Sequence, residues 1–352
     1  MDFTFTEDQV AFRAAISRFF MGEVAPEMLR EIWETDAGRS PALRARIAAQ
    51  GLTGLSVPES FGGMGMSDVD WALVTQELGY YAIPDSLSET ACIAAGLLSA
   101  LPADVAVRSE WLPRIVEGSA RIAVGHTVNP LVADAHLADL LLLHHEGEVH
   151  AVPRDRVEVT ANPSVDLSRR LGAVRWTPDP ATCVADAQTG RALWAETLDR
   201  GALCVAGQLL GLAQRMLDLS VDYVAQRKQF GRPIGSFQAV KHHLADVLTK
   251  IEFAKPVLYR AADRLRRGHP DRAAHISHAR LAAGEAAWLA ARHGIQVHGA
   301  MGYTWEVDLQ MFMKRAWALD AAWGDRGFHK TRVADFVLAE GAPLGPGRSL
   351  IE

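Results

Sequence analysis

The chain has 352 residues, of which 49% are hydrophobic and 22% charged, and its formal net charge is −6. This composition excludes a disordered, collagen-like or disulfide-stapled protein, and the length favours roughly two or three packed units. The 36 basic and 42 acidic residues do not favour a nucleic-acid partner, because such proteins usually carry a strongly basic face.

The first hundred residues are predicted to be mainly helical. Thr6 is placed to cap a helix whose apolar residues recur from Val10 to Phe20 with a period close to 3.6. Further helices are predicted over Pro41–Ala49 and Ser67–Gly79. Between them, the glycine-rich stretch GLTGLSVPESFGGMGM lacks the spacing of a phosphate-binding loop, so we interpret it as a turn between helices.

The sequence pattern changes over residues from about 120 to 185, where short apolar runs alternate with turn residues. This pattern predicts β-strands, with Glu146-Gly147 as a hairpin turn, and hence a small antiparallel β-domain. Long helical patterns return from Thr189 to about Leu338. Two apolar helix faces are predicted there: Val240, Leu244, Val247, Leu248 and Ile251, and Ile276, Ala279, Ala283, Ala286 and Ala290.

The three cysteines, Cys92, Cys183 and Cys204, are odd in number and far apart, with no C-x-x-C pair and no histidine spacing typical of zinc. We therefore expect reduced thiols, no metal site and a cytoplasmic location. The N-terminal stretch MDFTFTEDQVAFRAA is acidic where a signal peptide is basic, and no apolar run approaches about 18 residues. Neither an export signal nor a membrane span is expected.

Two segments of the C-terminal half are candidates for a binding site. The segment QRKQFGRPI, residues 226–234, has two interpretations. Either its basic residues complement the C-terminus of a helix, or its planar and cationic groups hold an anionic, aromatic cofactor. The segment QVHGAMGY, residues 296–303, also has two interpretations. Either it is a corner between two helices, or its small residues let a phosphate group reach the backbone. His242, His243 and His298 are expected to be packing or surface residues rather than metal ligands, since no third ligand has a matching spacing.

Taken together, LTGLSVPESFGGMGMS, RKQFGRPIGSFQAVKHHLADV and QVHGAMGYTWE resemble the acyl-CoA dehydrogenase family, in the right order over nearly the whole chain. The resemblance implies a mainly α member of the α+β class with three domains: an N-terminal helical domain (1–118), a reduced middle β-domain (119–188) and a C-terminal four-helix bundle (189–352). It also implies FAD at a subunit boundary, with its pyrophosphate and adenosine against the neighbour's bundle. The residues carried over for that half of the cofactor are Arg227, Gln229, Phe230, Gln238, Gln296, Val297, Gly299 and Ala300.

The departures from the family pattern concern the other half of the site. The T-E-P…G-S-D stretch and the W-[IV]-T-N strand, which hold flavin and thioester in the family, are missing, since RIAVGHTVNPLVADAHLADLLLL passes almost directly into a later strand. Counting without a gap from Gln296 through Glu306 places Trp323 where the family has its catalytic glutamate. The alternative base position on the long preceding helix is Gly201. Three aspartates remain nearby in sequence: Asp199, Asp320 and Asp325.

The chain therefore resembles the non-catalytic subunit of an α2β2 acyl-CoA dehydrogenase, a type found among bacterial enzymes that act on steroid side-chain CoA thioesters. The resemblance implies a homologous catalytic partner subunit, an acyl-CoA substrate and an electron-transferring flavoprotein as acceptor, hence a place in lipid metabolism and steroid degradation. Two alternatives stay open. One is a self-sufficient homo-oligomeric flavoenzyme that uses one of the aspartates, and the other is a structural or binding homologue without flavin.

Overall fold

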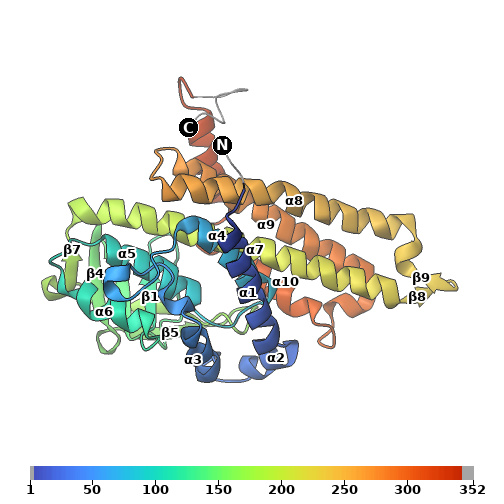
Figure 1. The fold of residues 1–352 in the computed structure, drawn as a ribbon, viewed down its shortest axis with the longest axis horizontal. Coiled ribbons are helices and arrows are strands. Elements are labelled where there is room, and N and C mark those ends of the chain that lie inside the picture. Colours follow the sequence, from blue (N-terminus) through green and yellow to red (C-terminus); the bar gives the residue numbers. More distant parts are fainter. Residues whose placement is uncertain (1–3, 343–352) are drawn as a thin grey trace. The chain divides into compact units, whose positions relative to one another are not determined.

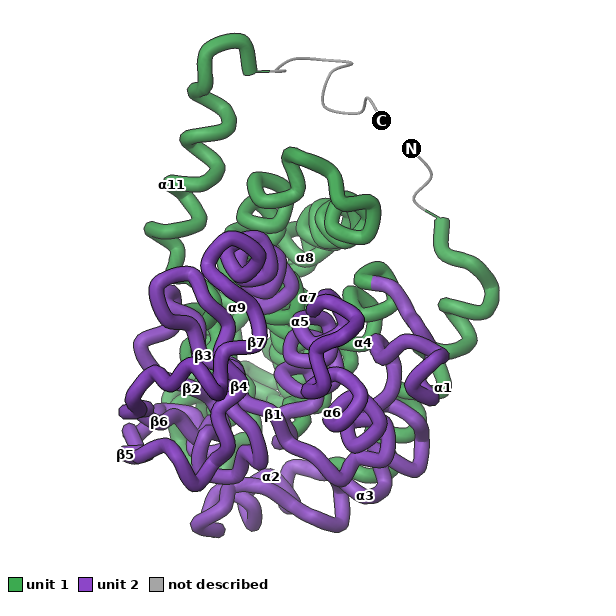
Figure 2. Tube along the Cα trace, turned by 90° about the vertical axis from the view of Figure 1, so that its left-hand side faces the viewer, with its two compact units in different colours: residues 1–24, 68–83, 202–352 green, residues 25–67, 84–201 purple. Residues whose placement is uncertain are grey.

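The computed structural model describes residues 4–342, which form two compact units. Of the described residues, unit 1 contains 4–24, 68–83 and 202–342, and unit 2 contains 25–67 and 84–201 (Figure 2). Neither unit is one continuous stretch, and the helix α7 (Ala187–Gln226) begins in unit 2 and ends in unit 1. The three-domain division at 118/119 and 188/189 stays a prediction. No helix within residues 4–342 is both long and apolar enough to cross a bilayer.

Unit 1 is helical apart from one short hairpin. Its elements, besides the second half of α7, are α1 (Glu7–Glu23), α4 (Asp68–Tyr80), β8 (Lys228–Gln229), β9 (Arg232–Pro233), α8 (Gln238–Arg266), α9 (Arg272–His298), α10 (Leu309–Leu319) and α11 (Arg326–Val337). The predicted cap of α1 is confirmed as a capping box: the Thr6 hydroxyl accepts from the Gln9 backbone N–H, and the Gln9 side chain accepts from the Thr6 N–H.

Small residues allow the helices of unit 1 to approach closely. A Cβ on Gly207 of α7 would lie 2.0 Å from the Thr75 hydroxyl oxygen, and one on Gly211 would lie 1.9 Å from the Gln76 carbonyl oxygen. Only glycine fits at these two points of the α4–α7 crossing. The predicted face of α9, from Ile276 to Ala290, is confirmed as buried. The predicted face of α8 is wrong at Leu248, which is 45% exposed, because α9 covers a narrower stripe of α8 than the pattern indicates.

Unit 2 combines short helices with two small sheets. Its helices are α2 (Pro26–Trp33), α3 (Pro41–Ala49), α5 (Ala95–Ala100), α6 (Ala106–Val116) and the first half of α7, with a π-helical turn over Glu89–Ala94. The strands are β1 (Ile122–Gly125), β2 (Val132–Ala133), β3 (Leu140–His145), β4 (Glu148–Pro153), β5 (Glu158–Asn162), β6 (Leu171–Arg175) and β7 (Cys183–Ala185). The predicted helix Pro41–Ala49 is confirmed, with Ser40 as its N-cap.

The strands form a sheet of order β1-β3-β4-β7 and a second sheet of order β2-β6-β5. The predicted turn at Glu146-Gly147 is confirmed, since both residues have positive φ (47° and 95°) between the paired strands β3 and β4. The prediction of an antiparallel domain is wrong for β1 and β3, which pair in parallel with Ile122 opposite Leu140. The chain between them crosses to the other sheet through β2, so β3 re-enters in the same direction as β1.

Candidate functional site

The first motif forms an exposed hairpin directly after α7. Residues Lys228 and Gln229 of β8 pair with Pro233 and Arg232 of β9. The two residues between the strands, Phe230 and Gly231, have φ of 53° and 80°, as a tight two-residue hairpin turn requires. The hairpin lies where α7 ends and before α8 begins (Figure 1).

The candidate cofactor residues on this hairpin face outward. Phe230 is 91% exposed, and Arg227, Gln229 and Gln238 are also exposed. Phe230 contacts Phe237 edge-on at 6.1 Å between ring centroids. The Phe230 ring and the Arg227 guanidinium are therefore both accessible to a partner or to an aromatic anion.

The second motif forms the C-terminal end of α9. Val297 and His298 are buried, whereas Gln296, Gly299 and Ala300 are exposed. The His298 Nδ1–H donates to the Gly294 carbonyl at 2.8 Å, so this histidine packs the helix end, and burial lowers its pKa. Gly299 ends the helix with φ 63° and ψ −141°, and a Cβ there would meet no atom within 4 Å. The backbone at this corner is therefore open for a ligand to approach.

One aromatic contact joins the two motifs. The rings of Tyr223 in α7 and His298 in α9 stack with centroids 4.1 Å apart and planes 22° apart. The Tyr223 hydroxyl also donates to the His298 carbonyl at 3.4 Å. Tyr223 lies one helical turn before Arg227, and their backbones are hydrogen-bonded at 2.9 Å. The fold thus brings together two motifs that are about 70 residues apart, as long-range helix packing allows.

Sequence reasoning did not identify Tyr223 as part of this arrangement. Its distance of four residues from Arg227 is the only signal the sequence offers, because that spacing places both side chains on one side of α7.

The position predicted for the base, Trp323, lies in the connection between α10 and α11. Its side chain is only 3% exposed, and its φ of 54° is unusual for a bulky residue. The His329 Nε2–H donates to the Trp323 carbonyl at 3.0 Å, and the Ser277 hydroxyl lies 3.0 Å from His329 Nδ1. Burial and the nearby Arg280 guanidinium lower the pKa of His329 to about 4, so it stays neutral at pH 7. This connection is therefore packed and held in place.

The two aspartates beside Trp323 have structural partners. The two carboxylate oxygens of Asp320 accept from Arg280 at 2.9 Å and from Arg326 at 2.7 Å. The Asp325 carboxylate caps α11 by accepting from the backbone N–H of Phe328 at 2.8 Å. Each carboxylate is engaged in holding the loop, which is a role that does not require proton transfer.

The remaining candidates lie in α7, within unit 2. Gly201 has no side chain, and Asp199 is buried, with 2% exposure.

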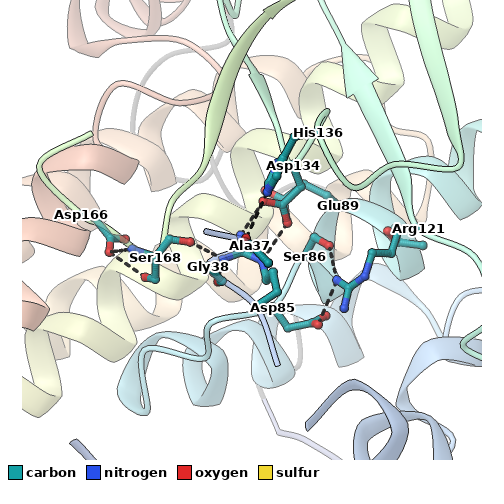
Figure 3. Close-up of polar contacts among 12 residues, drawn as sticks. Ala37, Gly38, Asp85, Ser86, Glu89, Arg121, Asp134, His136, Asp166 and Ser168 are labelled. Atoms are coloured by element: carbon teal, nitrogen blue, oxygen red, sulfur yellow. Dashed lines mark hydrogen bonds and ion pairs between the residues drawn. The ribbon is translucent and has the colours of Figure 1, made fainter. Parts of the chain in front are cut away.

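The connection between β1 and β3 in unit 2 is short, and buried ion pairs lie near it in the same unit (Figure 3). Only residues 126–139 connect β1 to β3. Arg39 binds both carboxylate oxygens of Asp134 at 2.9 and 2.6 Å, and both side chains are almost fully buried. Asp85 accepts from Arg44 and Arg121. Burial alone would raise the pKa of Asp85, but these guanidinium groups together hold it below its usual value.

Comparison with known sequences finds two family profiles on this chain. The profile "Acyl-CoA dehydrogenase, N-terminal domain" matches residues 6–119, and "Acyl-CoA dehydrogenase, C-terminal domain" matches residues 188–338. The chain is 34% identical over 314 residues to acyl-CoA dehydrogenase IpdE2 of Mycolicibacterium smegmatis, covering 88% of this chain and 93% of the relative. It is 33% identical over 318 residues to IpdE2 of Mycobacterium tuberculosis, covering 88% and 91%.

Among solved structures, the fold is similar to that of the ChsE4-ChsE5 complex from Mycobacterium tuberculosis. The TM-score is 0.87 at 24% identity, and the match covers 97% of this chain and 100% of the other. A match at this identity establishes the fold.

Proposed function

The chain belongs to the acyl-CoA dehydrogenase family, a family of oxidoreductases, and we propose that it is the non-catalytic subunit of a heteromeric FAD-dependent member. In the proposed complex, a homologous sister subunit supplies the catalytic glutamate and the flavin contacts of the β-domain. The present chain supplies the neighbour-facing half of the cofactor site. The reaction is α,β-dehydrogenation of an acyl-CoA thioester.

The observation that carries this proposal is the packing of Trp323, the residue that the ungapped count from Gln296 assigns to the base position. An indole has no basic lone pair, so it cannot remove the α-proton of a thioester. The packing around Trp323 leaves its side chain 3% exposed, and the carboxylates of Asp320 and Asp325 are engaged by guanidinium and backbone groups. This loop of the chain therefore provides no free carboxylate in place of the missing glutamate.

The exposed motifs fit half of a FAD site. Arg227 is an exposed guanidinium, suited to a pyrophosphate, and the open corner at Gly299 lets a phosphate approach backbone N–H groups. The Phe230 ring is free to lie against the adenine or a partner surface. FAD, when bound, accepts the hydride from the β-carbon. Gln229, Gln238, Gln296, Val297 and Ala300 complete the proposed half-site.

The connection from β1 to β3 supports the loss of the chain's own flavin half. Residues 126–139 leave no room for the T-E-P…G-S-D stretch and the additional strand of the family, and the nearby Arg39–Asp134 pair is internal to unit 2. A chain with one retained and one lost half-site is useful only beside a complementary subunit. We propose an α2β2 assembly, with an electron-transferring flavoprotein as acceptor. Action on a steroid side-chain CoA thioester is the substrate class that the family resemblance suggests.

The test is flavin stoichiometry. The chain is purified alone and after co-expression with its homologous sister subunit, and mass and bound FAD are measured for both. We expect one FAD per two chains in the complex and no FAD in this chain alone. One FAD per chain in a homo-oligomer that oxidises acyl-CoA would overturn the proposal in favour of an aspartate base. A complex with no flavin would favour the structural homologue.

A further inference from the structure

The strands β4 and β7 of unit 2 bring three metal-ligating side chains together, outside the proposed cofactor site. One ligand atom each of Glu148, His150 and Cys183 lies within 4.8 Å of the other two, and His150 Nε2 lies 3.0 Å from Glu148 Oε2. His150 is directly opposite Cys183 in the β4–β7 pairing, and Glu148 is two residues before His150 on the same strand. A bulge in β7 between the two paired positions shifts the register there, a device that redirects side chains.

The hydrogen bonds of His150 fix which ring nitrogen carries its proton. The Thr182 hydroxyl donates to the Asp179 carbonyl at 2.8 Å, since a carbonyl can only accept. Thr182 Oγ1 is therefore left as the acceptor for His150 Nδ1–H, at 3.0 Å. In a neutral ring, Nε2 then presents a lone pair to the Glu148 carboxylate oxygen only 3.0 Å away.

Two lone pairs at this separation repel each other unless a proton or a cation lies between them. His150 is 1% exposed, so its ring is enclosed by the protein around it. A bound cation removes the repulsion without charging the ring. The Nδ1–H bond to Thr182 is also the outer contact by which metal-binding histidines are usually oriented.

We propose that Glu148 Oε2, His150 Nε2 and Cys183 Sγ bind one Zn²⁺ ion, with water as the fourth ligand. A mixed thiolate, imidazole and carboxylate set suits zinc better than calcium or magnesium, which prefer oxygen ligands only. Tetrahedral zinc places its ligand atoms roughly 3.5 Å apart. The Glu148–His150 pair, at 3.0 Å, must therefore open slightly, and the pairs that involve Cys183 Sγ, at up to 4.8 Å, must close. On binding, the Cys183 thiol releases its proton to solvent, and Sγ gives up its contact with the Ala185 carbonyl.

Such a site would tie β7 to β4 at the sheet edge from which α7 starts. It departs from the expectation of no metal site, because the ligand spacing in sequence shows no zinc pattern. The cysteine and the histidine are 33 residues apart, and only the strand pairing makes them neighbours. The proposal is independent of the role of the chain in dehydrogenation.

The test is titration of the full-length, metal-free chain, without an affinity tag, with Co²⁺ under reducing conditions. We expect one Co²⁺ per chain, a thiolate-to-cobalt charge-transfer band, and displacement by Zn²⁺. Cys183→Ser should abolish the band, and the isosteric Glu148→Gln should weaken binding more than tenfold. Thr182→Val should weaken it about 10- to 100-fold, as loss of an outer-shell partner does. Cys204→Ser, a buried cysteine in unit 1, is the matched control and should bind as the parent does.

A chain that takes up no stoichiometric Co²⁺, or a band that persists in Cys183→Ser, would overturn the proposal. Nuclear magnetic resonance of the histidine nitrogens gives a second measurement that does not depend on any variant. If both ring nitrogens of His150 carry protons at neutral pH with Zn²⁺ present, then a proton, and not a metal ion, lies between His150 and Glu148, and the proposal is wrong.

Discussion

In unit 1, two exposed segments contrast with one buried connection. The hairpin at Phe230 and the α9 corner at Gly299 are exposed and have unfilled space around them. The α10–α11 connection at Trp323 is buried and held by His329, Arg280 and Arg326. Under the proposed function, the exposed segments serve the partner's cofactor site, whereas the buried connection no longer serves a site of this chain.

The experiment with the largest expected effect tests whether the catalytic base lies on the sister subunit or on this chain. In the reconstituted complex, replacing the sister's catalytic glutamate by glutamine should lower kcat about 10²- to 10⁴-fold, the usual contribution of a general base. Asp325→Asn in this chain should leave kcat within about twofold of the parent, because asparagine caps a helix as well as aspartate does. Steady-state turnover of an acyl-CoA measures both. A comparable loss in Asp325→Asn would identify Asp325 as the base.

The next largest effect concerns the exposed hairpin and the α9 corner. Arg227→Ala in this chain should weaken FAD binding to the complex by about 1.5–3 kcal/mol, the value of a charge-assisted hydrogen bond, or roughly 10- to 150-fold. The unfolding free energy should change by less than about 0.5 kcal/mol, since Arg227 is exposed. Flavin released during dialysis and urea unfolding are the two measurements. Arg18→Ala, an exposed arginine of α1, is the control, and equal flavin retention in both variants would remove Arg227 from the site.

The unfolding free energy should depend on pH through His329, which holds the buried α10–α11 connection. Its folded-state pKa of about 4 is below the ordinary 6.5, so the unfolded chain binds this proton first. The stabilisation from neutral His329 is therefore complete above pH 6.5 and is lost as the pH falls toward 4. Between pH 7 and 5 the loss should be roughly 2 kcal/mol of unfolding free energy.

Urea unfolding at a series of pH values, on the parent and on His329→Gln, isolates this contribution. The variant should be less stable at pH 7 and should lack this part of the pH dependence. Identical slopes for the two proteins would mean that His329 is not the titrating group.

The smallest expected effect is at Ala300, where the family usually has a second glycine. Ala300 is exposed, and its methyl group is compatible with an open corner. Ala300→Gly should therefore change FAD retention of the complex by less than about twofold, within the ±0.5 kcal/mol typical of surface changes. A larger gain would show that phosphate approaches the backbone more tightly at this residue than at Gly299.

Much of the local structure could be predicted from the sequence, because its causes are local. The capping box at Thr6, the helix Pro41–Ala49 and the turn at Glu146-Gly147 each depend on residues a few positions apart. The parallel pairing of β1 with β3 could not be predicted in this way, because strand partners are chosen by the whole sheet.

The candidate site shows the same division. The motifs at Arg227 and Gln296 were recognisable as runs of residues. The stack of Tyr223 on His298 and the pairing of Asp320 with Arg280 join residues 40 or more positions apart, and no local pattern encodes them. Whether Trp323 and the eight half-site residues have the roles assigned to them stays a prediction until the complex is assayed.

The burial of Trp323 also bears on whether the chain could gain a catalytic base by a single mutation. Restoring glutamate there would place a carboxylate where an indole is 3% exposed and would leave a cavity about the difference in size between the two side chains. Replacing a buried tryptophan by alanine costs about 3–5 kcal/mol; glutamate fills part of that space, but an unpaired buried carboxylate adds a cost of its own. Such a loss is a large share of the roughly 5–15 kcal/mol by which folded proteins are stable. Under the proposed function, a single Trp323→Glu change would therefore lower stability before it could restore activity, and dependence on a sister subunit would be hard to undo.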